Sequence, residues 1–481
     1  MAHPASTSLK DPSTLFYQSL YNRRLIIAAY WLVLVAALPI WWHTTSIQRL
    51  SLPTTRVNAQ AANSLRFPIR ISIQDPSLVD SLQNHLRARV AKDGLDVTVH
   101  SATEDNEATY EVIHNDSEAL VDGRRLSFPL RSATVPLLAD TLAGLLAPPL
   151  DSHRVVHYAP RYRLAFSLLN EDAAAGDAID SWDVSRAISL HLSSLFEALS
   201  VLHNFTIESQ VQFHAPLAFT PQPLADGVGL TPEDLTVFVN SAEWTLSSSV
   251  SNDPVLHFVV FVPSPSHRPM YILDAEGTPT SADSFLLPQW GGIVLHNPPE
   301  STSTSRSLPP SALVSLFPSF TKQFLALLGV PALPPGVRRL QTDQILTGWQ
   351  LDALLRLRAR ANTAEAAETL RSIVKLVAQI ENMPVKQDVR GDVLGSLDAL
   401  DQIYAPSSQS LNATLQHSAS ALTLASRAFF NPGMLALLYF PTEHKFAVYM
   451  PLFASAVIPL VATAVREIAA WRRTRREAAA Q

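Results

Sequence analysis

Residues that could carry catalysis are scattered along this chain of 481 residues. A protein metal site needs several histidine, cysteine or carboxylate ligands brought together. His85, His100 and His114 fall on three different expected elements, so a surface or core-edge role explains them more simply than metal binding. The chain contains no cysteine, which excludes a thiol nucleophile, a thiolate metal site and an iron–sulfur cluster.

The acidic clusters have the positions of loop and helix-capping residues rather than of acid–base pairs. Glu171 and Asp172 follow an expected strand, and Asp180 and Asp183 precede an expected helix. The turn at 290–292 contains two glycines, and a tight turn into a buried strand explains it more simply than a ligand site. Recognised catalytic and phosphate-binding motifs are missing from the sequence. We therefore predict no catalytic residue, no metal ligand and no cofactor.

Two long apolar segments near the ends of the chain set its class. Residues 25–42 and residues 446–465 contain no charged side chain. Each segment could cross a hydrocarbon layer of roughly 30 Å as a helix that rises about 1.5 Å per residue. The intervening residues 43–445 have the composition of a globular protein. The sequence therefore predicts a large soluble body that is tethered to a membrane at both ends.

Flanking charges predict the orientation of these two segments. Arg466 and four arginines between 472 and 476 follow the second segment, whereas only Lys445 immediately precedes it. Because basic residues next to a span favour the cytosolic side, residues 1–24 and the basic tail 466–481 are expected in the cytosol. The body is then lumenal or extracellular.

Two processing signals could imitate these segments. A cleaved signal peptide has an apolar core of about 7–15 residues, and the run at 25–42 is longer, which favours an uncleaved anchor. A C-terminal lipid-anchor signal ends in its hydrophobic tail, whereas this chain continues beyond Val465. Both segments are therefore expected to be retained transmembrane helices.

Three asparagines of the body begin sequons for N-glycosylation, namely Asn115, Asn204 and Asn412. Sequons arise by chance at about this frequency, so they agree with a lumenal body without establishing it. The net charge is −6 and the body has no basic block, which argues against nucleic acid as a partner.

The first part of the body alternates strand and helix patterns. Phe67–Ile73 alternates apolar and polar residues like a half-buried strand. Val255–Val262 is nearly all apolar, which is typical of a central strand that is covered on both faces. One apolar stripe predicts a helix over 184–202. We expect an α/β domain over 43–300, with a mixed sheet and covering helices.

After a Ser/Pro-rich linker the pattern changes to helices, and we expect a helical region over 311–440. The expected helices cover residues 313–328, 342–361, 364–381, 388–404 and 411–430. Leu438 and Phe440 lie in an apolar stretch that follows Asn431–Pro432 and is too short for a full helix. They are expected to contact the membrane surface or a partner, and burial in the chain's own core is an equal alternative.

Four segments resemble the PIG-S family and occur in the family's order. They are residues 38–45, 162–170, 289–297 and 437–453. The part between about 57 and 155 matches the family poorly. The membrane topology deduced from the apolar segments is also the family's.

The resemblance implies a non-catalytic structural or assembly subunit of the GPI transamidase of the endoplasmic reticulum. This enzyme complex replaces a C-terminal signal peptide of precursor proteins with a glycosylphosphatidylinositol (GPI) anchor. The implied partners are the caspase-like catalytic subunit PIG-K, PIG-T, PIG-U, the GPI anchor attachment protein and membrane lipid. Two other classes stay open: a membrane-tethered lumenal hydrolase, and a doubly anchored structural or receptor-like protein that is unrelated to the transamidase.

Overall fold

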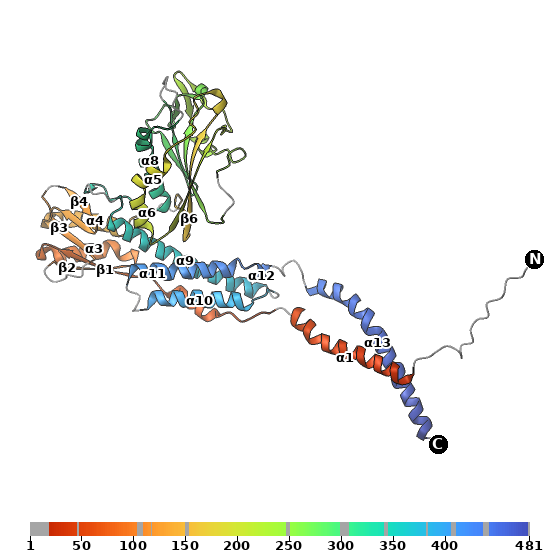
Figure 1. The fold of residues 1–481 in the computed structure, drawn as a ribbon. Coiled ribbons are helices and arrows are strands. Elements are labelled where there is room, and N and C mark those ends of the chain that lie inside the picture. Colours follow the sequence, from red (N-terminus) through yellow and green to blue (C-terminus); the bar gives the residue numbers. More distant parts are fainter. Residues whose placement is uncertain are drawn as a thin grey trace, which may run out of the picture. The chain divides into compact units, whose positions relative to one another are not determined.

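The computed structural model describes most of the chain (Figure 1). The described residues are 19–45, 48–102, 109–116, 118–149, 153–246, 251–298, 307–340, 345–380, 383–405, 410–435 and 442–479. The chain divides into two compact units. Unit 1 consists of Met1–Asn58, Thr369–Leu394 and Leu424–Gln481, and unit 2 consists of Ala59–Glu368 and Gly395–Thr423.

The first sheet of unit 2 has the strand order β14-β4-β5-β3-β1-β2. Its strands are β1 (Phe67–Ile73), β2 (Leu95–Ser101), β3 (Tyr110–His114), β4 (Ala119–Asp122), β5 (Arg125–Phe128) and β14 (Val337–Arg339). β1 pairs in parallel with β2 and β3, whereas β4 pairs antiparallel with β5. The helices α3 (Val79–Val90) and α4 (Val135–Leu146) share its apolar core. Phe67, Ile69, Ile71 and Ile73 are buried and Pro68 and Arg70 are exposed, which confirms the predicted alternation over 67–71, whereas Ser72 is buried as well.

The second sheet of unit 2 has the order β12-β13-β10-β6-β7. Its strands are β6 (Arg161–Asn170), β7 (Asn204–Gln212), β10 (Val255–Val262), β12 (Ser284–Leu287) and β13 (Gly291–Leu295). All of β10 beyond its first residue is buried, as predicted for a central strand. The helices α5 (Val184–His191), α6 (Ser193–Leu199) and α8 (Pro310–Leu328) share an apolar core with one face of this sheet.

The opposite face of the second sheet contributes to a separate apolar core. A three-stranded sheet packs there, formed by β8 (Gln222–Leu224), β9 (Gly227–Leu230) and β11 (Met270–Ile272), with the short helix α7 (Pro232–Thr236) beside β9. α8 is long and apolar enough to cross a membrane by length and composition. However, 44% of its apolar window is buried, and Phe317, Phe320 and Phe324 point into the core.

The single helix predicted over 184–202 is wrong, because the helix breaks at Leu192 into α5 and α6. The hydroxyl of Ser189 donates to the carbonyl of Ser185, and that of Ser193 donates to the carbonyl of Ser189. Serine hydroxyls that bond to the preceding turn compete with the helical hydrogen-bond pattern and bend helices. The apolar stripe is still buried, so the pattern located the core correctly.

The helical region consists of α9 (Gly348–Gln379), α10 (Gln387–Tyr404), α11 (Leu411–Phe429) and α12 (Pro432–Leu435). The two helices predicted over 342–361 and 364–381 are one helix, α9. Asn362 and Thr363, which resemble a helix start, are buried inside it, and the hydroxyl of Thr363 donates to the carbonyl of Ala359. The prediction of mixed sheets with covering helices and a C-terminal helical region is confirmed.

Unit 1 joins the two ends of the chain to parts of α9, α10 and α11. After α1 (Leu20–Thr45), Arg49 donates to the carbonyls of Val377 and Ile380 at 2.6 and 3.0 Å. The amide of Leu50 donates to the carbonyl of Val385 at 3.0 Å. The short helix α2 (Thr54–Ala59) follows, and α13 (Thr442–Ala479) closes the chain.

Candidate functional site

The helices α1 and α13 contact each other within unit 1 (Figure 1). Both expose apolar side chains along their length. Both are long and apolar enough to cross a membrane, and no residue in the apolar window of either is buried. Trp41 of α1 contacts two aromatic rings of α13 edge-on. Its ring centroid lies 5.9 Å from that of Tyr449 and 4.9 Å from that of Phe453. Such edge-to-face pairs contribute about 0.5–1.5 kcal/mol beyond their buried area.

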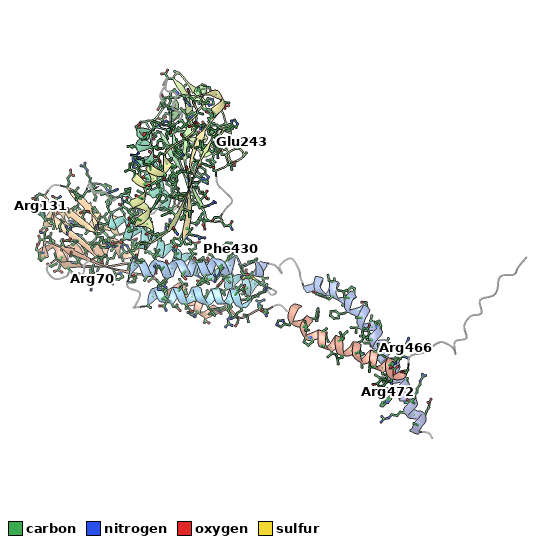
Figure 2. All side chains as sticks on the ribbon, in the orientation of Figure 1. Arg70, Arg131, Glu243, Phe430, Arg466 and Arg472 are labelled. Atoms are coloured by element: carbon green, nitrogen blue, oxygen red, sulfur yellow. The ribbon has the colours of Figure 1, made fainter. Side chains whose placement is uncertain are left out.

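An ionic contact joins α1 and α13 at the other end of the pair. Glu467 accepts from Nε of Arg23 at 3.2 Å and from Nε of Arg24 at 3.3 Å. The Glu467 side chain is 17% exposed, whereas the two arginines are about half exposed. Figure 2 labels Arg466 and Arg472, which belong to the same basic end of α13. The helix pair therefore has an aromatic end and a basic end.

A groove of about 800 Å³ lies between these two ends. It is lined by Tyr30, Leu34 and Ala37 of α1 and by Leu452, Ala456 and Leu460 of α13, among others. Pro459 lies inside α13 and lines the groove as well. The hydroxyl of Thr463 donates to the carbonyl of Pro459, so a side chain bonds the backbone beside the proline.

A polar cluster lies on the second sheet of unit 2, on the face away from α8. Nη1 of Arg163 donates to Glu208 at 3.1 Å, and the Arg163 side chain is almost fully buried. His257 stacks on Trp290 with a centroid distance of 4.7 Å. Burial and, to a smaller extent, the neighbouring positive charge of Arg163 lower the pKa of His257 to about 4. His257 is therefore neutral at pH 7.

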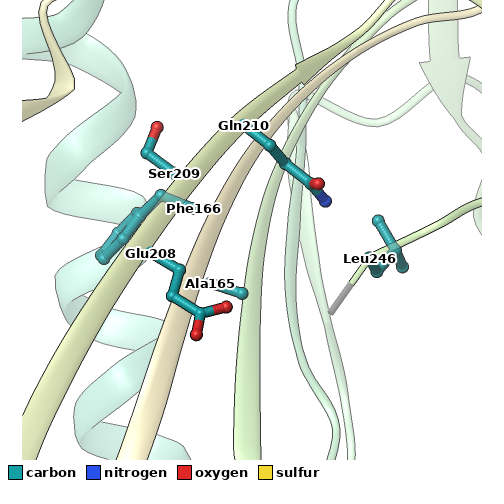
Figure 3. Close-up of a pocket in the computed structure, with 6 residues that line it drawn as sticks. All are labelled: Ala165, Phe166, Glu208, Ser209, Gln210 and Leu246. Carbon is teal, nitrogen blue, oxygen red and sulfur yellow. The ribbon is translucent and has the colours of Figure 1, made fainter. Parts of the chain in front are cut away.

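A pocket of about 440 Å³ adjoins this cluster at the edge strand β7 (Figure 3). Ala165, Glu208, Gln210 and Leu246 are among its lining residues. Nε2 of Gln210 donates to the hydroxyl of Ser167 at 3.1 Å and to the carbonyl of Thr245 at 2.9 Å. Glu208 is held in its ion pair with the buried Arg163. The polar groups that line this pocket are therefore a salt-bridged carboxylate and the side-chain amide of Gln210.

A second buried histidine has a packing role. His203 lies against the rings of Tyr158 and Tyr162, and its Nδ1 lies 2.6 Å from the carbonyl oxygen of Ala159. Burial lowers the pKa of His203 to about 4. It is neutral at pH 7, and Nδ1 donates the hydrogen bond.

A buried ionic network joins α9 to the first sheet of unit 2. Asp352 accepts two hydrogen bonds from Arg124 and one from the hydroxyl of Tyr110 at 2.9 Å. Arg356 donates to the same hydroxyl at 2.7 Å, and Trp349 stacks on the Tyr110 ring. Burial raises the pKa of Tyr110 well above its usual range. Sequence analysis missed this network, because its members are too far apart in the chain for any spacing pattern to connect them.

The acidic residues singled out in the sequence have two different roles. Asp172 caps the turn at Ala174, and Asp183 caps α5 at the amide of Arg186, as predicted. Glu171 lies in the bend that follows β6, as predicted, but its side chain is not on the surface. Glu171 is buried, accepts from the amide of Ser264 at 2.8 Å and lies 2.6 Å from Nδ1 of His267. It fixes the segment that follows β10.

The glycines at 291–292 are explained by packing. A Cβ at Gly291 would lie 2.0 Å from the carbonyl oxygen of His257 on the paired strand β10. A Cβ at Gly292 would lie 1.9 Å from Oε1 of Gln323 on α8. The close approach of β13 to β10 and α8 therefore requires glycine at both positions. This confirms the prediction of a tight turn that leads into a buried strand.

The predicted histidines and modification sites lie far apart. His85, His100 and His114 are on α3, β2 and β3, and within the described residues no three potential ligands are grouped closely enough for a metal ion. Asn204 and Asn412 are exposed, whereas Asn115 is partly buried and donates to the carbonyl of Glu118. Leu438 and Phe440 lie outside the described residues.

Three mixed sheets and a helical region form the body, and a pair of apolar helices near the chain ends are its exposed candidate membrane helices. These features define the class of a membrane-anchored protein with a large folded body. The family model of the phosphatidylinositol-glycan biosynthesis class S protein matches residues 28–123 and 149–474. The chain belongs to this family, PIG-S. The match includes most of the segment 57–155, so the poor resemblance predicted there is wrong for residues up to 123.

Curated relatives carry names from one enzyme complex. The chain is 32% identical over 373 residues to the mouse GPI-anchor transamidase component PIGS, which covers 74% of this chain and 66% of the mouse protein. It is 28% identical over 489 residues to the GPI transamidase component PIG-S homolog of Schizosaccharomyces pombe, covering 94% of this chain and 85% of that protein. It is also 28% identical over 317 residues to the Saccharomyces cerevisiae GPI transamidase component GPI17, covering 62% and 56%.

Proposed function

We propose that this chain is a non-catalytic assembly subunit of a GPI transamidase in the membrane of the endoplasmic reticulum. The match to the PIG-S family over most of the chain is the observation that supports this function. The chain lacks cysteine, and acyl transfer through a thioester needs a thiol nucleophile from another subunit. The partners that we propose are the caspase-like subunit PIG-K, PIG-T, PIG-U and the GPI anchor attachment protein.

Purification of the tagged full chain in mild detergent tests this proposal. We expect a cysteine-protease-like subunit and several polytopic membrane proteins to elute with it. The eluate should cleave a precursor that carries a GPI-attachment signal. Elution of the chain alone, with intact transamidase in the unbound fraction, would contradict the proposal and favour the unrelated anchored protein.

We also propose that α1 and α13 are transmembrane helices with both chain termini in the cytosol. The exposed apolar surfaces of both helices and the arginines at the end of α13 support this topology. Protease added to intact microsomes should then trim only the short tails. Digestion of the body under these conditions would contradict the topology.

The lumenal position makes the three sequons substrates for N-glycosylation. Asn204 and Asn412 are exposed and favour glycan attachment, whereas Asn115 must release its hydrogen bond to Glu118. Treatment with an N-glycosidase, followed by mass spectrometry of the resulting aspartates, reports occupancy at each site. Unmodified asparagine at all three positions would count against a lumenal body.

A further inference from the structure

The groove between α1 and α13 combines an apolar wall with a charged end. Its volume of about 800 Å³ falls within the range of about 300–1,000 Å³ that is usual for ligand sites. At one end Ile26 lines the groove and lies one helical turn from Arg23. On α13, Thr463 lines the same end and lies about one turn from Arg466. An apolar ligand in this groove would therefore have its outer end among basic side chains.

We propose that the groove binds one acyl chain of an anionic glycerophospholipid, whose phosphate lies among these arginines. The basic end holds seven arginines and two glutamates over residues 20–24 and 466–479. Basic pockets between transmembrane helices bind anionic lipid headgroups, and the planar guanidinium group suits phosphate oxygens. A zwitterionic lipid would leave this excess of positive charge unmatched. This assignment rests on the proposed membrane insertion of α1 and α13.

The dimensions of the groove favour an acyl chain over a partner helix. From Ile26 to Trp41, α1 rises about 22 Å, and half of a hydrocarbon core is about 15 Å thick. A lipid chain that enters at the basic end therefore fits within the groove. A helix of about 10 Å diameter and the same 22 Å length has a volume of roughly 1,700 Å³, about twice that of the groove.

A photoreactive phosphatidylserine with a diazirine in its acyl chain tests the site. It is incorporated into phosphatidylcholine nanodiscs that contain the full chain in its purified complex. We expect labelling in the peptides that contain Ala37 and Ala456, and severalfold better competition by unlabelled phosphatidylserine than by phosphatidylcholine. Ala37→Phe, which fills the groove, should reduce this labelling severalfold. Ala36→Phe is the matched control, because Ala36 is exposed but does not line the groove.

The charge requirement is tested separately by R466Q combined with R472Q. This variant should keep the labelling but remove the preference for phosphatidylserine over phosphatidylcholine. Equal competition by both lipids against the unsubstituted chain would overturn the proposal, and so would labelling that Ala37→Phe leaves unchanged. Cross-links to another polypeptide from a photoreactive amino acid placed at position 37 would show that a partner helix occupies the groove. Extraction of the chain by alkaline carbonate would instead refute membrane insertion itself.

Discussion

Arg124 donates two hydrogen bonds to Asp352, from Nε at 2.7 Å and from Nη2 at 2.8 Å. The Asp352 carboxylate is almost fully buried. The bidentate pair therefore compensates a negative charge that folding removes from water. The pair links the β4–β5 turn to the first part of α9 within unit 2.

Replacing Asp352 with Ala should therefore destabilise the body strongly. It removes the acceptor of the buried Tyr110 hydroxyl and of Arg124, whose side chain is 55% exposed, and leaving a buried polar group unsatisfied costs about 1–3 kcal/mol. The melting temperature of the purified chain measures this loss. The exposed Asp122 is the control, since Asp122→Ala should change the melting temperature little. Equal decreases in melting temperature for the two substitutions would show that the buried network does not stabilise the folded chain more than a surface carboxylate does.

Gly292→Ala should destabilise the second sheet through overpacking. The added methyl group meets Oε1 of Gln323, whose Nε2 donates to the carbonyls of Phe285 and Ile293. Overpacking of this kind costs about 1–3 kcal/mol. Denaturant unfolding should show a partial rescue when Gln323→Ala is added to the glycine substitution, because space is restored.

Gly391 provides the opposite control. It lies in α10, and no atom would lie within 4 Å of an added Cβ. Gly391→Ala should stabilise the chain by about 0.5–1 kcal/mol, because alanine has the higher helix propensity. Destabilisation by both glycine substitutions to the same extent would refute the packing explanation for Gly292.

Acidification should destabilise the body through its two buried histidines. Burial lowers the pKa of His203 and of His257 to about 4, whereas the unfolded chain titrates near 6.5. The unfolded state therefore binds protons first as the pH falls below about 6.5, and stability decreases from there towards pH 4. Each pKa unit corresponds to at most about 1.4 kcal/mol.

Thermal melts at a series of pH values measure this dependence. His257→Gln should flatten the decrease between pH 6.5 and 4 relative to the unsubstituted chain. His85→Gln is the control, because His85 is on the surface of α3 and not buried. An unchanged pH profile for His257→Gln would show that folding leaves the pKa of this histidine near its unfolded value.

The proposed non-catalytic role of this subunit predicts the result of polar substitutions. Glu208→Gln and Ser209→Ala, at the pocket of Figure 3, should leave transamidation by assembled complex unchanged. Removal of residues 442–481 should instead lower the yield of complex. Loss of transamidation in a Glu208 variant with normal assembly and melting temperature would indicate direct chemistry by this chain.

Leu438 and Phe440 are expected to contact a partner or the membrane surface. Replacing both with Asp should release partner subunits while the melting temperature of the chain stays unchanged. Co-purification and a thermal melt on the same preparation separate the two interpretations. A fall in melting temperature as large as that of a core substitution would show that both residues belong to the core.

Local periodicity predicted much of the fold. The stripe of Val389, Val393 and Leu397 on α10 is buried, and so is the apolar run of β10. Both patterns depend on a repeat within a few residues, which a single sequence displays directly. The same reasoning located the caps at Asp172 and Asp183, because a cap acts on amides two or three residues away.

Contacts between residues far apart in the chain could not be predicted from the sequence. The same is true of side-chain hydrogen bonds that compete with the helical backbone. Nothing around Glu171 indicates that the chain returns with Ser264 and His267 to bury it. The break at Leu192 depends on serine hydroxyls that bond backward, although their positions within the helix suit an unbroken helix equally well. The groove between α1 and α13 was also missed, since its walls come from opposite ends of the chain.

The contacts of Arg49 with Val377 and of Leu50 with Val385 set an order of folding. A ribosome that has just released Arg49 must add more than three hundred residues before these partners exist. At about 5–20 residues per second this takes on the order of tens of seconds. During this interval unit 2 can already form most of its three sheets, whereas unit 1 must wait for the last quarter of the chain. A nascent chain that ends before Val377 should therefore contain the folded sheets of unit 2 while unit 1 is still incomplete, and a chaperone or partner subunit would first meet the chain in this state.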